Sequence, residues 1–208
     1  MENEFRGSLK SAKEIFDKHA ELYRQRFMDV SAYSKGLEYL CERLPMDAQV
    51  LEIACGPGNV TRFLLDNRPD LKILGTDISP KMIDLARVNI PTARFEVLDC
   101  REIKSLDHKF DVIVCGFCLP YLKPEETEQF FEDARETLVP KGLLYVSTIC
   151  DDPSNSGIKT NSAGDKTMIY YYLENDLIQL LTRKGFKILD HHFVLRDNEK
   201  DVLIIAEI

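Results

Sequence analysis

The stretch Val50-Leu-Glu-Ile-Ala-Cys-Gly-Pro-Gly-Asn59 joins a predicted strand to a predicted helix and decides the fold. Its apolar run enters a turn that contains Gly56 and Gly58, and a helical pattern over 59–67 follows at once. Glycines let the backbone approach a ligand closely, and the free N–H groups of a helix N-terminus attract an anionic group. An ordinary strand-to-helix turn also uses glycine, so this stretch alone leaves both interpretations open.

Strands and helices alternate after this stretch. Helices are expected at 59–67, from Pro80 onward and at 124–137, and apolar runs predict strands at 50–54, 71–76, 94–98, 110–115 and 143–149. Two further runs, 186–195 and 202–208, are predicted to pair antiparallel, because six polar residues are too few for a parallel crossover. We expect an α/β, Rossmann-like fold: a mainly parallel seven-stranded sheet with helices on both faces and a C-terminal antiparallel strand hairpin.

The 208 residues fit a single domain, 1–208. Residues 1–45 are expected to form an N-terminal helical cap, with a helix over 11–28 and a second helix that Ser31 caps and that runs to about Arg43. Residues 46–208 form the Rossmann-like core. Within it, the polar segment Asp151–Lys166 makes 150–168 a candidate lid loop, since long loops in compact domains are usually lids, binding loops or disordered.

The amino-acid composition limits the classes of molecule that this protein is expected to bind. The net charge of −8 and the lack of a long basic cluster argue against nucleic acid. No apolar stretch is long enough to span a membrane, and the polar N-terminus has no signal-peptide core, so a cytoplasmic location is expected. The six cysteines are interpreted as buried thiols. No metal site is expected, because neither a second Cys-x-x-Cys nor a close histidine pair is present.

Asp77 follows Gly56 by 21 residues and stands just past the second predicted strand. In doubly wound sheets an acidic residue at this place accepts hydrogen bonds from ribose hydroxyls. The alternative is a helix N-cap ahead of Ser79. A dinucleotide site would have a third glycine or alanine where this chain has Thr61, which argues against NAD.

At these residues the chain resembles the class I S-adenosylmethionine-dependent methyltransferases of the small-molecule type. Val50–Gly58 looks like their first motif, and further segments resemble, in the family's order, the ribose-binding motif (75–82), the adenine-contacting segment (95–100), the fourth strand (110–115), the fifth strand (138–145) and the turn into the sixth (184–186). The likeness spans nearly the whole chain. Ala54 departs from the family's frequent glycine, and Pro120-Tyr121 stands where related enzymes often have His-His.

The resemblance implies a role for each matching residue. Glu52 and Cys115 would lie near the methionine portion of the cofactor S-adenosylmethionine, and Asp77 would bind its ribose. The backbone cradle would be formed by Ala54, Cys55, Gly56 and Gly58. Ile78, Met82, Asp99 and Cys100 would contact the adenine, and Tyr23 would close over the cofactor or simply pack in the core. Tyr121 is the candidate catalytic residue, for acceptor orientation or proton removal, with plain packing as the alternative.

The implied activity is methyl transfer to a small-molecule acceptor by in-line displacement, by a monomer or a homodimer. Two other interpretations stay open: a non-catalytic cofactor-binding protein or partner subunit, and, less favoured, a nucleotide-dependent oxidoreductase. A lid that contains Asp151, Asp152 and Asp165 would disfavour large anionic acceptors, so a neutral or cationic metabolite is expected.

Overall fold

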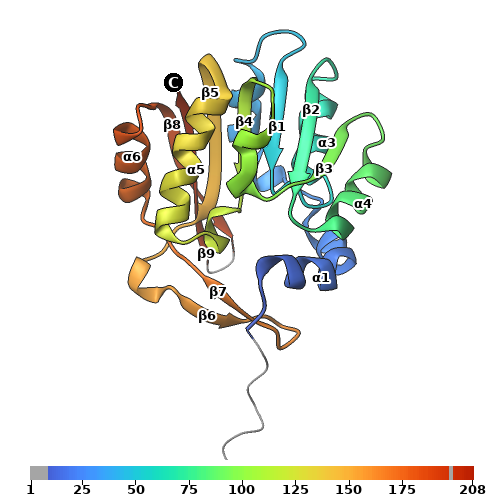
Figure 1. The fold of residues 1–208 in the computed structure, drawn as a ribbon, viewed down its shortest axis with the longest axis vertical. Helices are drawn as coiled ribbons and strands as arrows, with labels where there is room; N and C mark the ends of the chain where they lie inside the picture. Colours follow the sequence, from blue (N-terminus) through green and yellow to red (C-terminus); the bar gives the residue numbers. More distant parts are fainter. Residues whose placement is uncertain (1–8, 197–198) are drawn as a thin grey trace, which may run out of the picture.

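The computed structural model describes residues 9–196 and 199–208, and seven of its strands form one sheet in the order β3-β2-β1-β4-β5-β9-β8 (Figure 1). These strands are β1 (Gln49–Ile53), β2 (Lys72–Asp77), β3 (Arg94–Val97), β4 (Phe110–Gly116), β5 (Leu138–Ile149), β8 (Lys187–Arg196) and β9 (Glu199–Glu207). Strands β1 to β5 pair in parallel, whereas β9 runs antiparallel to both β5 and β8. The predicted sheet and its C-terminal hairpin are confirmed. Residues 1–8 of the predicted cap and 197–198 of the predicted connection lie outside the described residues.

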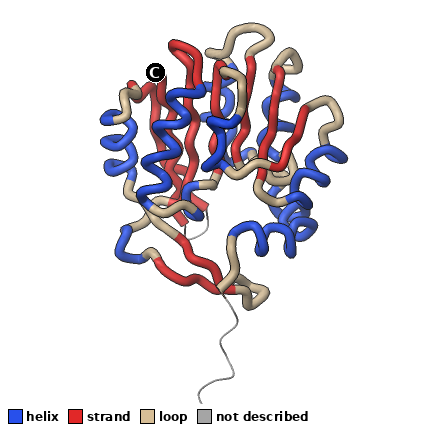
Figure 2. The backbone as a smooth tube through the Cα atoms, in the orientation of Figure 1, coloured by secondary structure: helices blue, strands red, loops and turns tan. Residues whose placement is uncertain are grey.

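Helices cover both faces of the sheet (Figure 2). On one face lie α5 (Pro124–Thr137) and α6 (Glu174–Arg183), on the other α2 (Ser34–Cys41) and α3 (Asn59–Asn67), while α4 (Pro80–Asn89) packs on β2 and β3. Successive side chains of a strand point to opposite faces. In β4, Ile113 therefore packs toward α5, whereas Val112 and Val114 pack toward α2 and α3. Burial on both sides is why these strands read as continuous apolar runs.

The observed boundaries correct three details. Strand β5 begins at Leu138, five residues before the predicted start, because Leu138 pairs with Phe110 across an irregularity in the register. Strand β8 ends at Arg196 and strand β9 begins at Glu199, so the connection between them is shorter than predicted. Ser31 does not cap the second helix: it begins the 3-10 turn Ser31–Tyr33 (η1), and α2 starts only at Ser34.

The polar segment after β5 is a hairpin and not an irregular loop. Strands β6 (Gly157–Thr160) and β7 (Lys166–Ile169) pair antiparallel. In the turn between them, the Asn161 side chain accepts hydrogen bonds from the backbone N–H groups of Ala163 and Asp165. The segment expected to be a loop thus contains an ordered two-stranded element, and its role as a lid stays a prediction. Both strands have four residues, β6 is mostly exposed and β7 is mostly half-buried, so they leave no alternating apolar pattern in the sequence.

Asp165 joins this hairpin to α1 (Ala12–Phe27), which also lies below the carboxyl ends of the strands in Figure 1. The Asp165 carboxylate lies 2.5 Å from Lys10 Nζ, 2.8 Å from Lys18 Nζ and 2.6 Å from His19 Nε2. Hydrogen bonds from these three side chains hold the pKa of Asp165 well below its usual range. The backbone N–H of Lys10 also donates to the carbonyl of Lys166. The hairpin and α1 are therefore held together by charge.

Among the described residues, no helix is both long enough and apolar enough to cross a bilayer.

Asp165→Asn is expected to loosen this contact, because the amide keeps an oxygen acceptor but loses the charge that attracts the two lysines. Hydrogen exchange should become faster over 12–27 and 157–169 and stay unchanged in β1, β4 and β5. The exposed Asp66 on α3 offers a control, Asp66→Asn, which removes the same charge elsewhere. Unchanged exchange in both segments of the Asp165 variant would show that the ion pairs do not hold them.

Candidate functional site

A cavity of about 540 Å³ opens at the carboxyl ends of β1, β2, β4 and β5. Glu52, Asp77 and Gly116 line it from the sheet, and Tyr23 lines it from α1. The volume is typical of small-molecule sites, and in open α/β sheets ligands bind at this edge. The cavity is therefore the candidate functional site.

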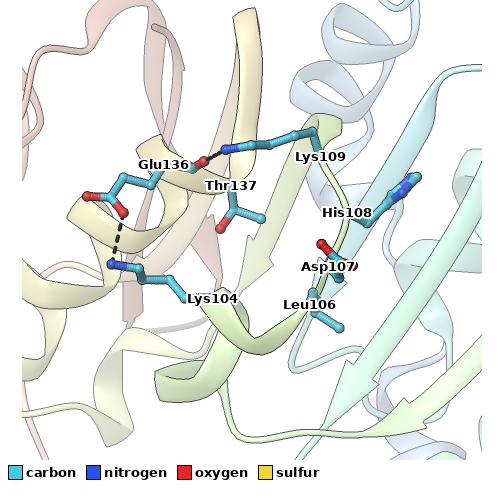
Figure 3. Close-up of a pocket in the computed structure, with 7 residues that line it drawn as sticks. All are labelled: Lys104, Leu106, Asp107, His108, Lys109, Glu136 and Thr137. Atoms are coloured by element: carbon cyan, nitrogen blue, oxygen red, sulfur yellow. Dashed lines mark hydrogen bonds and ion pairs between the residues drawn. The ribbon is translucent and has the colours of Figure 1, made fainter.

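A second hollow lies at the opposite edge of the sheet, before β4 begins (Figure 3). Lys104 Nζ lies 2.8 Å from a carboxylate oxygen of Glu136 there, and Lys109 donates to the Glu136 carbonyl. None of the predicted site residues lines this hollow. It is a surface ion-pair cluster away from the carboxyl ends of the strands.

The Asp77 carboxylate bridges the glycine turn and the start of α4. Its Oδ2 accepts a hydrogen bond of 2.9 Å from the Gly56 N–H, and its Oδ1 accepts one of 2.8 Å from the Ser79 N–H. Asp77 is only 7% exposed, and burial raises its pKa to about 6. The N-cap of α4 is Ser79, whose Oγ accepts from the Met82 N–H. Asp77 is therefore not the helix cap of the alternative interpretation, and it lines the cavity.

Glu52, the penultimate residue of β1, has a buried carboxylate that accepts a hydrogen bond from the Thr61 hydroxyl. Burial raises the pKa of Glu52 to about 8, so its side chain is mostly protonated at pH 7. Thr61 is fully buried in α3. In the sequence Thr61 argues only against a dinucleotide, whereas in the structure its hydroxyl bonds to Glu52 and orients it.

The turn after β1 uses the left-handed backbone region three times, at Ala54 (φ 55°), Gly56 (φ 53°) and Gly58 (φ 85°). A Cβ atom on Gly56 would lie 3.5 Å from the Tyr23 ring, whereas one on Gly58 would lie 2.4 Å from Ile90 Cδ1. Gly56 thus keeps space at the cavity, and Gly58 lets α3 begin against α4. Ala54 adopts the conformation that favours glycine and lines the cavity.

Ten of the thirteen predicted site residues line the cavity: Tyr23, Glu52, Ala54, Gly56, Asp77, Ile78, Met82, Asp99, Cys100 and Tyr121. Three do not. Cys55 packs among the residues between α4 and β3, and Gly58 contacts that same cluster. Cys115 is fully buried in the core under α5, because it points to the opposite side of β4 from its neighbours. Cys115 thus does not line the cavity, and its expected place near the methionine portion stays a prediction. All six cysteines are free thiols, four of them buried.

Asp99 has a structural partner that the sequence did not reveal. Its Oδ1 accepts from the backbone N–H of Arg101 at 3.0 Å and from Nε at 2.8 Å, and its Oδ2 lies 2.7 Å from Nη2. Burial acts to raise the pKa of Asp99, but the hydrogen bonds from Arg101 outweigh it and lower the pKa. Asp99 thus caps the 3-10 turn Cys100–Ser105 (η2), and adenine recognition by this carboxylate stays a prediction.

Aromatic side chains from α1 close the cavity on the side away from the sheet. The Phe16 ring lies 5.1 Å from the Tyr121 ring and 5.7 Å from the Tyr23 ring, and Tyr23 lies 4.6 Å from Phe27. Burial raises the pKa of Tyr23 to about 12 and raises that of Tyr121 further. Both hydroxyls keep their protons, which disfavours Tyr121 as a base. The sequence missed Phe16 and Phe27 as site residues because their spacing fits core packing equally well.

The comparisons with known proteins agree with this geometry. Residues 50–142 match the family described as a methyltransferase domain. The chain is 35% identical to a trans-aconitate 2-methyltransferase of Variovorax paradoxus over 50% of this chain and 39% of that one. It is 27% identical to a tRNA N(3)-methylcytidine methyltransferase of Drosophila melanogaster over 66% and 48%, so it spans less than half of either relative.

A solved structure is similar over most of the chain. The 1,6-didemethyltoxoflavin-N1-methyltransferase of Burkholderia thailandensis, with bound S-adenosylhomocysteine, superposes with a TM-score of 0.73 at 21% identity, covering 94% of this chain and 86% of that one. The chain therefore has the fold of this S-adenosylhomocysteine-bound methyltransferase, and its residues 50–142 match a methyltransferase domain, in agreement with the resemblance seen in the sequence.

The raised pKa of Glu52 predicts how the stability of the ligand-free protein depends on pH. The folded pKa is about 8 against an ordinary 4.5, so the stability that the bound proton contributes is full below pH 4.5 and is lost as pH rises through 8. Glu52→Gln cannot ionise. Between pH 6.5 and 9 its Tm should fall less than that of the wild type, by roughly a few degrees. The exposed Glu42 provides the control Glu42→Gln, and parallel curves for all three proteins would contradict the burial of an ionisable Glu52.

Proposed function

We propose that this protein transfers a methyl group from S-adenosylmethionine to a small-molecule acceptor. The observation that carries the proposal is the buried Asp77 carboxylate, which lines the cavity, is only 7% exposed and is held by the Gly56 and Ser79 N–H groups. Two backbone bonds leave lone pairs on this carboxylate that suit a pair of hydroxyl donors. When bound, the cofactor supplies a methyl group that is already activated on a sulfonium.

The lining residues fit this cofactor. Asp77 would accept from the ribose hydroxyls, and Ile78 and Met82 would pack on the adenine, near Asp99 and Cys100. Glu52 would lie near the ammonium group, which favours the ionised carboxylate, so Glu52 would release its proton on binding. Ala54 and Gly56 would border the methionine portion with backbone atoms.

The other residues that line the cavity would position the cofactor and the acceptor for the reaction. Phe16, Tyr23 and Phe27 cover the cavity and exclude water, and the walls hold the reacting atoms in line. Proximity and alignment of this kind supply about 7–11 kcal/mol of a barrier. Tyr121 would orient the acceptor as a hydrogen-bond donor, since its raised pKa keeps the hydroxyl protonated.

A small acceptor is supported by the enclosed volume and by the net charge of −8, which disfavours a polyanion. The similarity to a tRNA methyltransferase makes RNA the competing acceptor. A protein that binds the cofactor without catalysis is the other alternative. A methyl-transfer assay that measures S-adenosylhomocysteine formation with a metabolite panel and with tRNA separates the three. Turnover with a metabolite supports the proposal, while turnover with tRNA alone, or tight cofactor binding without any turnover, contradicts it.

Asp77→Ala is expected to weaken S-adenosylhomocysteine binding by at least about tenfold, and by about a hundredfold if two hydrogen bonds are lost. The reason is that charge-assisted hydrogen bonds contribute about 1.5–3 kcal/mol each. Calorimetry measures the affinity, and circular dichroism establishes that the variant is folded. In the wild type, affinity should also weaken as pH falls through about 6, where a proton occupies the carboxylate that accepts the hydroxyls.

Asp66→Ala on the exposed face of α3 is the matched control and should bind like the wild type. A folded Asp77→Ala protein with undiminished affinity would remove the ribose assignment.

A further inference from the structure

The cavity has a half that the proposed cofactor residues do not occupy. Apart from Tyr23, those residues lie at or just after the carboxyl ends of β1, β2 and β3 or in the first turn of α4. Five of the remaining lining residues come from η1, the position after β4, β5 and β8, and we call this group the acceptor lobe: Tyr33, Phe117, Tyr145, Ser147 and Arg196. Three of these five side chains are aromatic and one is a cation.

Arg196 is held in a fixed orientation in this lobe. Its guanidinium carbon lies 5.7 Å from the ring centroid of Tyr33 and 5.6 Å from that of Phe117. Its Nε donates a 2.7 Å hydrogen bond to Oδ2 of Asp201, which is completely buried. The Tyr33 hydroxyl donates to the same oxygen at 2.7 Å. Asp201 thus joins the N-terminal cap to the C-terminal hairpin and fixes one edge of the guanidinium.

The two terminal nitrogens of the Arg196 guanidinium donate no hydrogen bond to another of the described residues. Besides Asp201, the acid near this group is Glu199, which also lines the cavity; its carboxylate lies 3.7 Å from Nη2, beyond hydrogen-bond distance, and is 60% exposed. The Arg196 side chain is itself 33% exposed and lines the cavity. Two terminal nitrogens in one plane match the two oxygens of a carboxylate, which accepts from them in parallel.

We infer that the methyl acceptor carries a carboxylate, which Arg196 binds, and an apolar ring, which packs against Tyr33 and Phe117. This inference rests on the proposed function. A cationic acceptor that packed on the same two rings would be repelled by the positive charge of Arg196. Tyr33 serves as a wall, since burial and its bond to Asp201 raise its pKa and keep the hydroxyl protonated.

The acceptor class differs from the one expected from the sequence. That expectation assumed that Asp151, Asp152 and Asp165 face the site, but none of them is among the described residues that line the cavity. Asp165 is paired with Lys10, Lys18 and His19 instead. Arg196, the charged member of the acceptor lobe, is a cation, and the largely exposed Glu199 lines the cavity beside it.

The test uses three probes of one shape: benzoate, benzamide and benzylamine, each titrated into the protein saturated with S-adenosylhomocysteine. The wild type should bind benzoate at least about tenfold more tightly than benzamide, and benzylamine most weakly. Arg196→Met should abolish the preference for benzoate, and Arg196→Lys should retain part of it. Arg43→Met is the matched control, because Arg43 also lies over a tyrosine ring, Tyr39, and 3.8 Å from an acid, but not in the cavity.

Arg196→Met leaves the buried Asp201 carboxylate without its cation, so the variant is paired with Arg196→Met/Asp201→Asn, which removes both charges. The double variant should fold, bind S-adenosylhomocysteine like the wild type and show no preference among the probes. If the wild type binds S-adenosylhomocysteine but treats benzoate and benzamide alike, prefers benzylamine or binds no probe, the acceptor class is wrong and the proposed function stands. If S-adenosylhomocysteine itself does not bind, the proposed function fails, and the inference fails with it.

Discussion

The hydrogen bond from the Gly56 N–H to the Asp77 carboxylate connects the two strands on which the candidate site depends. It ties the turn after β1 to the end of β2, and the second carboxylate oxygen ties that point to the start of α4. Burying a carboxylate is costly unless it is hydrogen-bonded, and two backbone donors offset that cost here. Because these donors leave the pKa of Asp77 at about 6, the group is ionised near neutral pH and can still accept further hydrogen bonds. The turn, the carboxylate and the helix start are therefore one structural unit.

Residues of one sequence motif have different physical roles in this unit. Gly56 leaves room at the cavity, whereas Gly58 leaves room for Ile90 of the neighbouring α4 segment. Cys115 and Gly116 are adjacent, yet Gly116 lines the cavity and Cys115 is buried in the core under α5. A resemblance assigns roles by position along the chain, but alternation along a strand decides which side chain reaches the site.

The sequence predicted the parts of the fold that local patterns determine. Helix α3 follows from the glycine turn, and α5 follows from Pro124 and its apolar face, so both were placed at their observed boundaries. The contacts of Asp165 with Lys10 and Lys18 join residues about 150 positions apart, and no local pattern records them. The same holds for Asp201, which meets Tyr33 across 168 positions. What could not be predicted is the pairing of charges, which fixes both the hairpin on α1 and the orientation of Arg196.

These long-range pairs also explain why the methyltransferase-domain match bears on the proposed cofactor site more than on the proposed acceptor site. The family match covers residues 50–142, which contain Glu52, Asp77 and Asp99. Four of the five residues of the acceptor lobe lie outside it, in the N-terminal cap and beyond residue 142. The net charge of −8 says little about this lobe either, because Asp165 and Asp201 are each neutralised by a cation at close range. The walls of the lobe can therefore change without disturbing the Gly56–Asp77 bond, so acceptor choice and cofactor binding are physically separable in this fold.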